Sequence, residues 1–173
     1  MAKELELRRH TDNDGDVLND DGVREALRIG ERLRGGYSLS VSTGAQRATQ
    51  ALACMLAALT ERVPRGVVVE PRLRSEHEDR WKEIASQANG KDLSAFRAVD
   101  ARFVQAEAQR LSEGLRAVLD RLDEEERALV IGHSPTNEAA IYGLTDLQIA
   151  PLSKGGGVLL VCDEKGFQVE QLT

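Results

Sequence analysis

Two histidines of this sequence each stand at the end of a strand-like segment. His10 follows Arg9 in LELRRHT, and His133 precedes Ser134 in ALVIGHS. A neutral imidazole is a good nucleophile, and a protonated one stabilises negative charge that develops during a reaction. Arg47 follows another strand-like segment, YSLSVST at residues 37–43. Its guanidinium group matches the oxygens of a phosphoryl group. Together these residue types predict chemistry on a phosphoryl group.

The elements that would position these residues alternate along the chain. Residues 4–9 alternate polar and apolar side chains, which predicts a strand that is half exposed or at an edge. The continuous apolar run over residues 66–71 is typical of a buried strand. Strands are expected over residues 4–9, 37–43, 66–71 and 128–133, a hairpin over 157–172, and helices over 21–34, 44–62, 95–122 and after residue 134.

Helix caps and stops support these helices. Asp20 or Asp21 is expected to cap the first helix, and Thr43 the second. Strand–helix alternation of this kind predicts an α/β fold, a three-layer α/β/α sandwich whose sheet is mostly parallel with an antiparallel edge strand. We expect one domain over residues 1–173, with a surface loop or lid at residues 72–94 and a flexible glycine-rich entry to the final hairpin at residues 155–157.

In an open α/β sheet, ligands bind at the carboxyl ends of the strands. His10, His133 and Arg47 all come at such ends, and the third strand leads into Glu76 and Glu78. Helix N-termini at the same edge would add backbone N–H donors. A carboxylic acid near the leaving oxygen can protonate it, and the arginines can supply the charge that magnesium supplies in other phosphoryl-transfer enzymes.

These segments, taken in order, resemble the histidine phosphatase superfamily, which also contains the cofactor-dependent phosphoglycerate mutases. The resemblance rests on LRRHT, on Leu18 and Gly22 in DVLNDDGVREALRIGERL, on VSTGAQRATQAL and on IGHSPTN, and it spans about residues 4–145. In size the chain resembles the short bacterial phosphohistidine phosphatases. The resemblance implies His10 as the phosphorylated nucleophile and Arg9 and Arg47 as phosphate-binding residues.

The same resemblance implies that His133 stabilises charge and that the Ser134 backbone amide contacts the phosphoryl group. Thr11 stands where the family usually has glycine, beside the phosphoryl group, and we expect it to be a phosphate-binding residue. The family's acidic residue would fall near Ser75, so Glu76 is the first candidate for the general acid and Glu78 the second. If neither carboxylate reaches the site, substrates with easy leaving groups, such as phosphohistidine or acyl phosphate, would be favoured.

Composition excludes several other function classes. The net charge of −6 and the 3% aromatic content argue against binding nucleic acid by bulk charge or by base stacking. No segment is apolar for long enough to span a bilayer, and a cytoplasmic location is expected. The two cysteines and three histidines show no metal-ligand spacing, so no metal and no cofactor are expected.

We therefore expect a metal-independent phosphatase acting on a phosphorylated small molecule or a phosphoprotein. Two alternatives remain open. One is a phosphotransferase of the phosphoglycerate mutase type, which would return the phosphoryl group to its substrate. The other is a phosphate-binding or protein-docking module that has lost catalysis.

Overall fold

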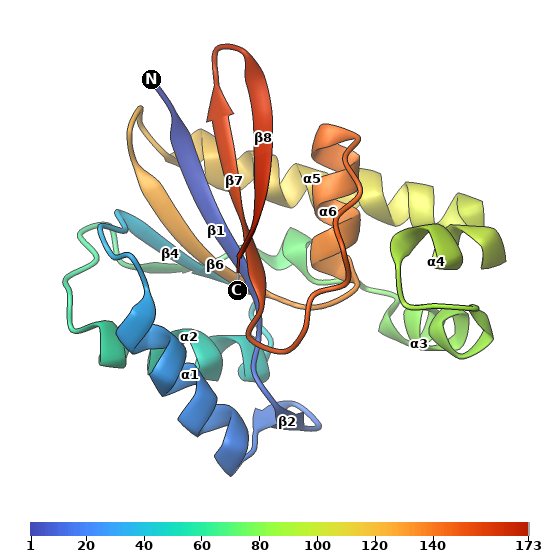
Figure 1. Cartoon of the computed structure of the whole chain (residues 1–173), viewed down its shortest axis with the longest axis horizontal. Coiled ribbons are helices and arrows are strands. Elements are labelled where there is room, and N and C mark those ends of the chain that lie inside the picture. Colours follow the sequence, from blue (N-terminus) through green and yellow to red (C-terminus); the bar gives the residue numbers. More distant parts are fainter. Residues whose placement is uncertain (173) are drawn as a thin grey trace.

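The computed structural model describes residues 1–172, and Thr173, the last residue of the expected domain, lies outside them. Its main sheet consists of the strands β1 (Lys3–Arg9), β4 (Leu39–Ser42), β5 (Val67–Val69), β6 (Arg127–Gly132), β7 (Gly157–Asp163) and β8 (Gly166–Leu172). They lie in the order β5-β4-β6-β1-β7-β8 (Figure 1). Neighbours from β5 to β1 are parallel, whereas β7 is antiparallel to both β1 and β8. The expected mostly parallel sheet with antiparallel pairing towards one edge is confirmed.

Helices cover both faces of this sheet (Figure 1). They are α1 (Asp20–Arg32), α2 (Gln46–Leu59), α3 (Glu78–Gln87), α4 (Leu93–Val99), α5 (Ala101–Arg121) and α6 (Thr136–Thr145), with the short 3-10 helix η1 (Pro71–Leu73). Leu129 and Ile131 of β6 pack into the core with α1 and α2, and Ala128 and Val130 pack into the core with α5 and α6. Both faces of β6 are therefore buried, as its apolar run indicates, and the three-layer sandwich is confirmed.

The first strand lies inside the sheet and not at its edge. β1 pairs with β6 on one side and with β7 on the other. Leu5 and Leu7 point into the larger core, while Glu6 and Arg8 form a buried ion pair 2.5 Å long on the opposite face. The Tyr37 hydroxyl donates to Glu6 at 2.8 Å. The polar–apolar alternation therefore reflects a buried charge pair, which the pattern alone cannot distinguish from an exposed face.

The third strand is also placed differently from the expectation. β5 forms the edge of the sheet, and Val67 and Val69 are 56% and 54% exposed. A short apolar run indicates strand propensity, but it does not show whether a second neighbour covers the strand.

The first helix has a different cap from the one expected. Asn19, and not Asp20 or Asp21, accepts a hydrogen bond from Gly22 N through its side chain at 2.8 Å. Gly22 also needs to lack a side chain, because a Cβ there would lie 1.9 Å from the carbonyl oxygen of Asp12. The close approach fixes α1 against the segment that follows His10.

The long helix expected over residues 95–122 is two helices. The chain breaks at Asp100, whose Oδ1 accepts from Phe103 N at 3.1 Å and thereby caps α5. Its Oδ2 accepts from Arg80 Nη2 at 2.7 Å, which ties α3 to this break. The apolar positions on either side keep a similar spacing, so periodicity did not reveal the interruption.

The expected lid at residues 72–94 is mostly ordered helix. It contains the end of η1, the whole of α3 and the start of α4. Trp81 of α3 is buried, and its ring meets those of Phe96 and Phe103 edge to face, with centroids 6.2 and 5.1 Å apart. Trp81 therefore anchors the segment on the core.

The glycine-rich entry to the last hairpin is held by β1. Arg9 N donates to Gly156 O at 2.9 Å, and Gly155 N donates to Arg9 O at 3.1 Å. Gly155 has a φ of +78°, a conformation that favours glycine. The expected flexible entry is instead a turn that fixes the backbone beside His10.

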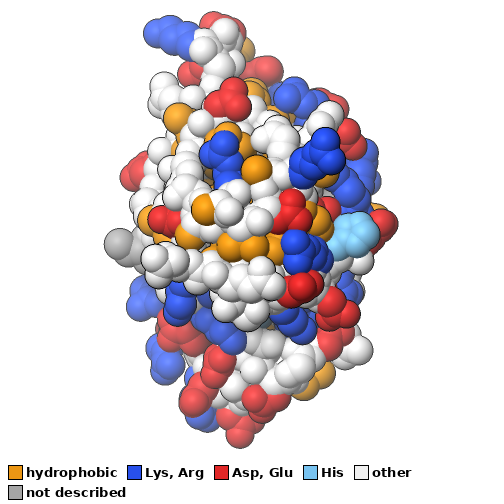
Figure 2. All heavy atoms as spheres, turned by 90° about the vertical axis from the view of Figure 1, so that its right-hand side faces the viewer, with side chains coloured by type: hydrophobic (Ala, Val, Ile, Leu, Met, Phe, Trp, Pro, Cys, Tyr) orange, Lys and Arg blue, Asp and Glu red, His pale blue; other side chains and the backbone are white. Residues whose placement is uncertain are grey.

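No helix within residues 1–172 is long and apolar enough to cross a membrane. Figure 2 shows the side of the molecule formed by α3 and α4, where lysine and arginine side chains alternate with aspartate and glutamate. On this face, charges of both signs are mixed, which is unlike the one-sided basic patch of a nucleic-acid-binding surface.

Candidate active site

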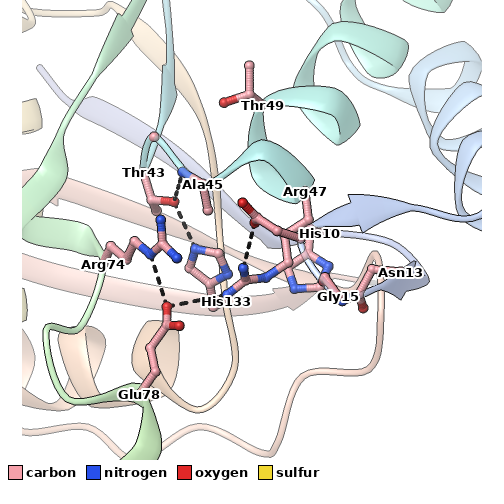
Figure 3. Close-up of polar contacts among 12 residues, drawn as sticks. His10, Asn13, Gly15, Thr43, Ala45, Arg47, Thr49, Arg74, Glu78 and His133 are labelled. Carbon is pink, nitrogen blue, oxygen red and sulfur yellow. Dashed lines mark hydrogen bonds and ion pairs between the residues drawn. The ribbon is translucent and has the colours of Figure 1, made fainter.

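The two strand-end histidines meet at the carboxyl edge of the sheet. β1 and β6 are parallel neighbours in which Arg9 pairs with Gly132, and His10 N donates to Gly132 O at 3.0 Å. The side chains of His10 and His133 consequently lie side by side, with ring centroids 5.3 Å apart and planes at 64° (Figure 3). The structure thus brings together the two histidines that the sequence singled out.

The tautomer of His10 is fixed by the backbone. Its Nδ1 lies 2.7 Å from the carbonyl oxygen of Thr11. Because a carbonyl oxygen can only accept, Nδ1 carries the proton and Nε2 carries the lone pair. Burial, with further contributions from the charges of Arg47 and Arg9, lowers the pKa of His10 to about 4. His10 is therefore a neutral imidazole at pH 7.

His133 is held by Thr43, which was expected from the sequence to cap a helix. Its Nε2 lies 2.8 Å from Thr43 Oγ1 at the end of β4 (Figure 3). Thr43 was expected to cap the following helix, but Ala45 occupies that position and makes no side-chain cap. Burial, followed by the charge of Arg47, lowers the pKa of His133 to about 3. The position of Thr43 at a strand end was the signal that could have placed it in the site.

Arg47 enters the site from the first turn of α2. Its side chain is 15% exposed and its two terminal nitrogens contact different carboxylates. Nη1 donates to Asp16 Oδ1 at 2.8 Å, and Nη2 donates to Glu78 Oε1 at 3.3 Å. Asp16 lies between β2 (Asn13–Asp14) and β3 (Val17–Leu18), and sequence reasoning missed it. The β2–β3 hairpin and α3 thus both contact the guanidinium group of Arg47.

Of the two acid candidates, only Glu78 lies in the site. Its carboxylate accepts from Arg47 and, at 3.0 Å, from Nε of Arg74 (Figure 3). Burial alone would raise the pKa of Glu78, but the hydrogen bond from Arg74 and the charges of both arginines outweigh it and lower the pKa. Glu78 is therefore ionised at neutral pH. Arg74 thus contributes to the site through its contact with Glu78.

Glu76, the first candidate for the acid, points elsewhere. Its side chain is 73% exposed and pairs with Arg110 Nη2 at 3.2 Å. The neighbouring Ser75 lines the cavity, but its hydroxyl donates to buried Glu107. Two adjacent residues of an extended segment point to different sides, so a shift of one position decides which of them reaches the site.

Arg9 and Thr11 flank His10, and the side chain of each donates a hydrogen bond to a backbone carbonyl group. Arg9 Nη1 donates to Leu152 O at 2.9 Å, and burial lowers the pKa of Arg9 while the charge of Glu138 opposes that shift. The Thr11 hydroxyl donates to Gly22 O at 2.7 Å. The expectation that Thr11 binds phosphate is therefore not supported for its side chain, because the hydroxyl is directed into α1. The contribution of Thr11 to the site is its carbonyl group.

A cavity of about 520 Å³ opens beside His133 and Arg47. One face of α3 forms one wall, and the residues at the N-terminus of α6, including Ser134, form another. Within residues 1–172, no group of three or more His, Cys, Asp or Glu side chains is arranged to hold a metal ion. The wall from α3 consists of Glu78, Trp81, Lys82 and Ala85.

The arrangement can bind and transfer a phosphoryl group. Arg47 and the N-terminus of α6 provide positive charge and N–H donors at one end of the cavity. The neutral His10 offers a lone pair at Nε2, and His133 stands beside it. Of the site residues named from the sequence, Arg47, His133 and Ser134 line the cavity and His10 lies against His133. Arg9 stands next to His10 outside the cavity lining, whereas Glu76 and the Thr11 hydroxyl point elsewhere.

Comparison with solved structures shows the same fold in several proteins of low sequence identity. The phosphoglycerate mutase of Bacillus anthracis str. Sterne is 16% identical with a TM-score of 0.69, and the match covers 99% of this chain and 92% of that one. The alpha-ribazole phosphatase of Shigella flexneri is 18% identical with a TM-score of 0.69, covering 98% and 95%. A protein of Agrobacterium tumefaciens assigned as the phosphohistidine phosphatase SixA is 17% identical with a TM-score of 0.59, covering 98% and 97%.

A comparison with curated proteins gave no match. The family model for the histidine phosphatase superfamily (branch 1) matches residues 2–172, which is nearly the whole chain and includes every segment that builds the site. The chain therefore belongs to the histidine phosphatase superfamily, branch 1.

Proposed function

We propose that this protein is a phosphatase that works without a metal ion and passes the phosphoryl group through His10. The observation that carries the proposal is the hydrogen bond between His10 Nδ1 and the Thr11 carbonyl, which leaves the Nε2 lone pair available. The low pKa of His10, about 4, keeps that nitrogen unprotonated at neutral pH. His10 lies at the end of a strand, with His133, Arg9 and Arg47 near it.

In the first step, Nε2 of His10 attacks phosphorus. The N–P bond forms while the bond from phosphorus to the leaving group breaks, and the leaving group departs with its electron pair. Arg9, Arg47 and the Ser134 backbone amide hold the phosphoryl oxygens. His133 stabilises the charge on the transferring group.

In the second step, water attacks the phosphorylated His10 in line. The new O–P bond forms, the N–P bond breaks and phosphate leaves, while the proton of the water passes to a base. Glu78 is the carboxylate placed to receive it, because it lies beside Arg47 in the cavity. The pKa of Glu78 is lowered, and a carboxylate that is ionised at neutral pH is in the correct state to act as a base.

The same ionised state makes Glu78 a weak acid for the first step. Ser75 stands near the position of the family's acidic residue and directs its hydroxyl towards Glu107. We therefore propose substrates whose leaving group needs little protonation, such as phosphohistidine or an acyl phosphate. An alkyl phosphate, whose leaving oxygen needs a proton, would react more slowly.

The presence of Ser75 near the position of the family's acidic residue also favours a second candidate, a phosphate-binding module without turnover. A module of this kind would use the same arginines and helix N-terminus but would not need a general acid.

The test is turnover of acetyl phosphate, a phosphohistidine peptide and p-nitrophenyl phosphate in the presence of EDTA. Wild type and His10→Ala are compared on each substrate. We expect turnover that survives the chelator, favours the first two substrates and is lost in the variant. Phosphate binding without turnover of any substrate would favour the binding module, and a requirement for a bisphosphorylated primer would favour a mutase. Turnover that persists in His10→Ala would contradict the proposed mechanism.

A further inference from the structure

A buried carboxyl group lies behind the phosphoryl end of the cavity. Glu138, in the first turn of α6, is only 2% exposed. Its Oε2 accepts a hydrogen bond from the Ser134 hydroxyl. Its charge also acts on Arg9 of β1, where it opposes the effect of burial on the pKa of that arginine. Glu138 is thus linked to two residues to which the proposed function assigns phosphate binding.

The hydrogen-bonding state of this cluster is unusual. Among the described residues, the buried side-chain polar atoms without a hydrogen-bond partner are Arg9 Nε, His133 Nδ1 and Glu138 Oε1, and all three belong to this site. A buried polar atom without a partner costs free energy, and native structures retain few of them. The cluster is therefore poorly explained as a device that only stabilises the fold.

The contacts of Ser134 and Arg9 indicate what the carboxylate does. Because the Ser134 hydroxyl donates to Glu138, its backbone N–H is the donor that remains for a phosphoryl oxygen. Arg9 is fixed at Nη1 by the Leu152 carbonyl, its buried Nε has no hydrogen-bond partner, and the charge of Glu138 opposes the lowering of its pKa by burial. Glu138 is almost fully buried and its Oε2 is engaged by the Ser134 hydroxyl, so it is placed to orient neighbouring groups and not to contact the substrate.

We propose that Glu138 is a positioning residue that sets the orientation of Arg9 and of the first turn of α6 for the phosphoryl group, an inference that rests on the proposed function. Charge alone would give the opposite effect. A carboxylate near a bound phosphoryl group repels it, so its removal would strengthen anion binding if orientation did not matter. The sign of the change therefore separates positioning from simple electrostatics.

The experiment compares wild type with Glu138→Gln, which keeps the size of the side chain and its ability to accept from Ser134. KM and kcat for acetyl phosphate and the inhibition constant for orthovanadate are measured. We expect KM and the vanadate constant to rise about tenfold or more, with a smaller change in kcat, because the phosphate-binding groups lose their orientation. Combined with Arg9→Gln, the substitution should add little, because both act on the same guanidinium group.

Glu6→Gln is the matched control. Glu6 is equally buried and forms an ion pair with Arg8, and neither of these two residues lines the cavity. We expect it to lower the melting temperature while leaving the vanadate constant within about twofold of wild type. If Glu138→Gln does not fold, as judged by near-UV circular dichroism, Ser134→Ala replaces it, and a smaller rise in KM is then expected.

The outcomes separate the two levels of the argument. A wild-type protein that neither turns over acetyl phosphate nor binds vanadate would overturn the proposed function, and this inference with it. An active wild type with a folded Glu138→Gln that binds vanadate equally or more tightly would overturn the positioning role alone. An equal loss of vanadate binding in Glu6→Gln would also overturn it, because the effect would then belong to any buried carboxylate.

Discussion

His10 owes its proposed role to one backbone contact. The Thr11 carbonyl fixes the proton on Nδ1, and the surroundings keep the ring neutral with a pKa of about 4. The residue types of the site could be named from the sequence, because histidine and arginine at strand ends are few. Their orientation could not, because it depends on bonds such as Thr43 to His133 and on which of Glu76 and Glu78 faces inward.

The first prediction concerns these two carboxylates. Glu78→Gln should lower kcat for both phenyl phosphate and acetyl phosphate by about tenfold to a hundredfold, because the water that attacks the phosphorylated His10 loses its base in the step that both substrates share. Glu76→Gln serves as the control, since its side chain is exposed and pairs with Arg110. Steady-state kinetics on both substrates measures the difference. A loss in Glu76→Gln that equals the loss in Glu78→Gln would contradict this assignment.

The second prediction follows from the lowered pKa values of His10 and His133, about 4 and about 3. The folded state resists protonation that the unfolded chain accepts near pH 6.5, so the unfolded state binds more protons as the pH falls. The free energy of unfolding should therefore decrease from pH 6.5 towards pH 4, by up to about 1.4 kcal/mol per pH unit for each histidine.

Urea denaturation at several pH values measures this dependence. The control is the double variant His10→Gln/His133→Gln, which removes both titrating rings and should flatten the curve over that range. An identical slope in the double variant would show that carboxylates, and not these histidines, set the acid sensitivity.

At the scale of the elements, the site depends on where neighbouring strands end. β1, β4 and β6 all end at one edge, and their last residues lead directly into His10, Thr43 and His133. Strand and helix identity followed from hydrophobic pattern and turn residues. The order of strands did not, so the first strand was expected to be half exposed or at an edge and the strand over residues 66–71 to be buried. The break at Asp100 could not be predicted either. The Asp100 side chain caps α5 through Phe103 N, and the apolar spacing continues across the break.

The third prediction tests the helix that supports the backbone after His10. Asn19→Ala should lower the free energy of unfolding by about 1 kcal/mol, because its side chain caps α1 through Gly22 N. Asp20→Ala is the comparison, since Asp20 was an expected cap but lies inside the helix. Its loss should be smaller, reflecting only the interaction with the helix dipole. Chemical denaturation measures the free energy of unfolding of both variants. An equal decrease in the two would contradict the assignment of Asn19 as the cap.

At the scale of the whole molecule, a single α/β sandwich brings the cavity to one edge of the sheet. The sandwich and its family could be foreseen because several weak motifs occur in the right order along most of the chain. The cavity wall could not, because residues 72–94 show no clear helical period, and the inward face of α3 is set by the packing of Trp81 against Phe96 and Phe103.

The fourth prediction links ligand binding to the stability of the whole fold. A ligand that binds only the folded state stabilises it, by about 2.7 kcal/mol at a concentration one hundred times its dissociation constant. Orthovanadate should therefore raise the melting temperature of wild type in a concentration-dependent way. Arg47→Met should abolish that rise, because it removes the guanidinium group at the cavity. Arg65→Met, which removes an exposed pair with Glu126, should preserve it. A wild-type melting temperature that vanadate leaves unchanged would contradict a phosphate site in this cavity.

The most direct test of the account is to trap the covalent intermediate. Wild type is mixed with acetyl phosphate, quenched in alkali within milliseconds and digested, and the phosphorylated peptide is identified by mass spectrometry. We expect an acid-labile, alkali-stable phosphoryl group on His10 that is absent from His10→Ala. Turnover with the label on another residue, or with no phosphorylated enzyme at any quench time, would contradict the central claim that the phosphoryl group passes through His10.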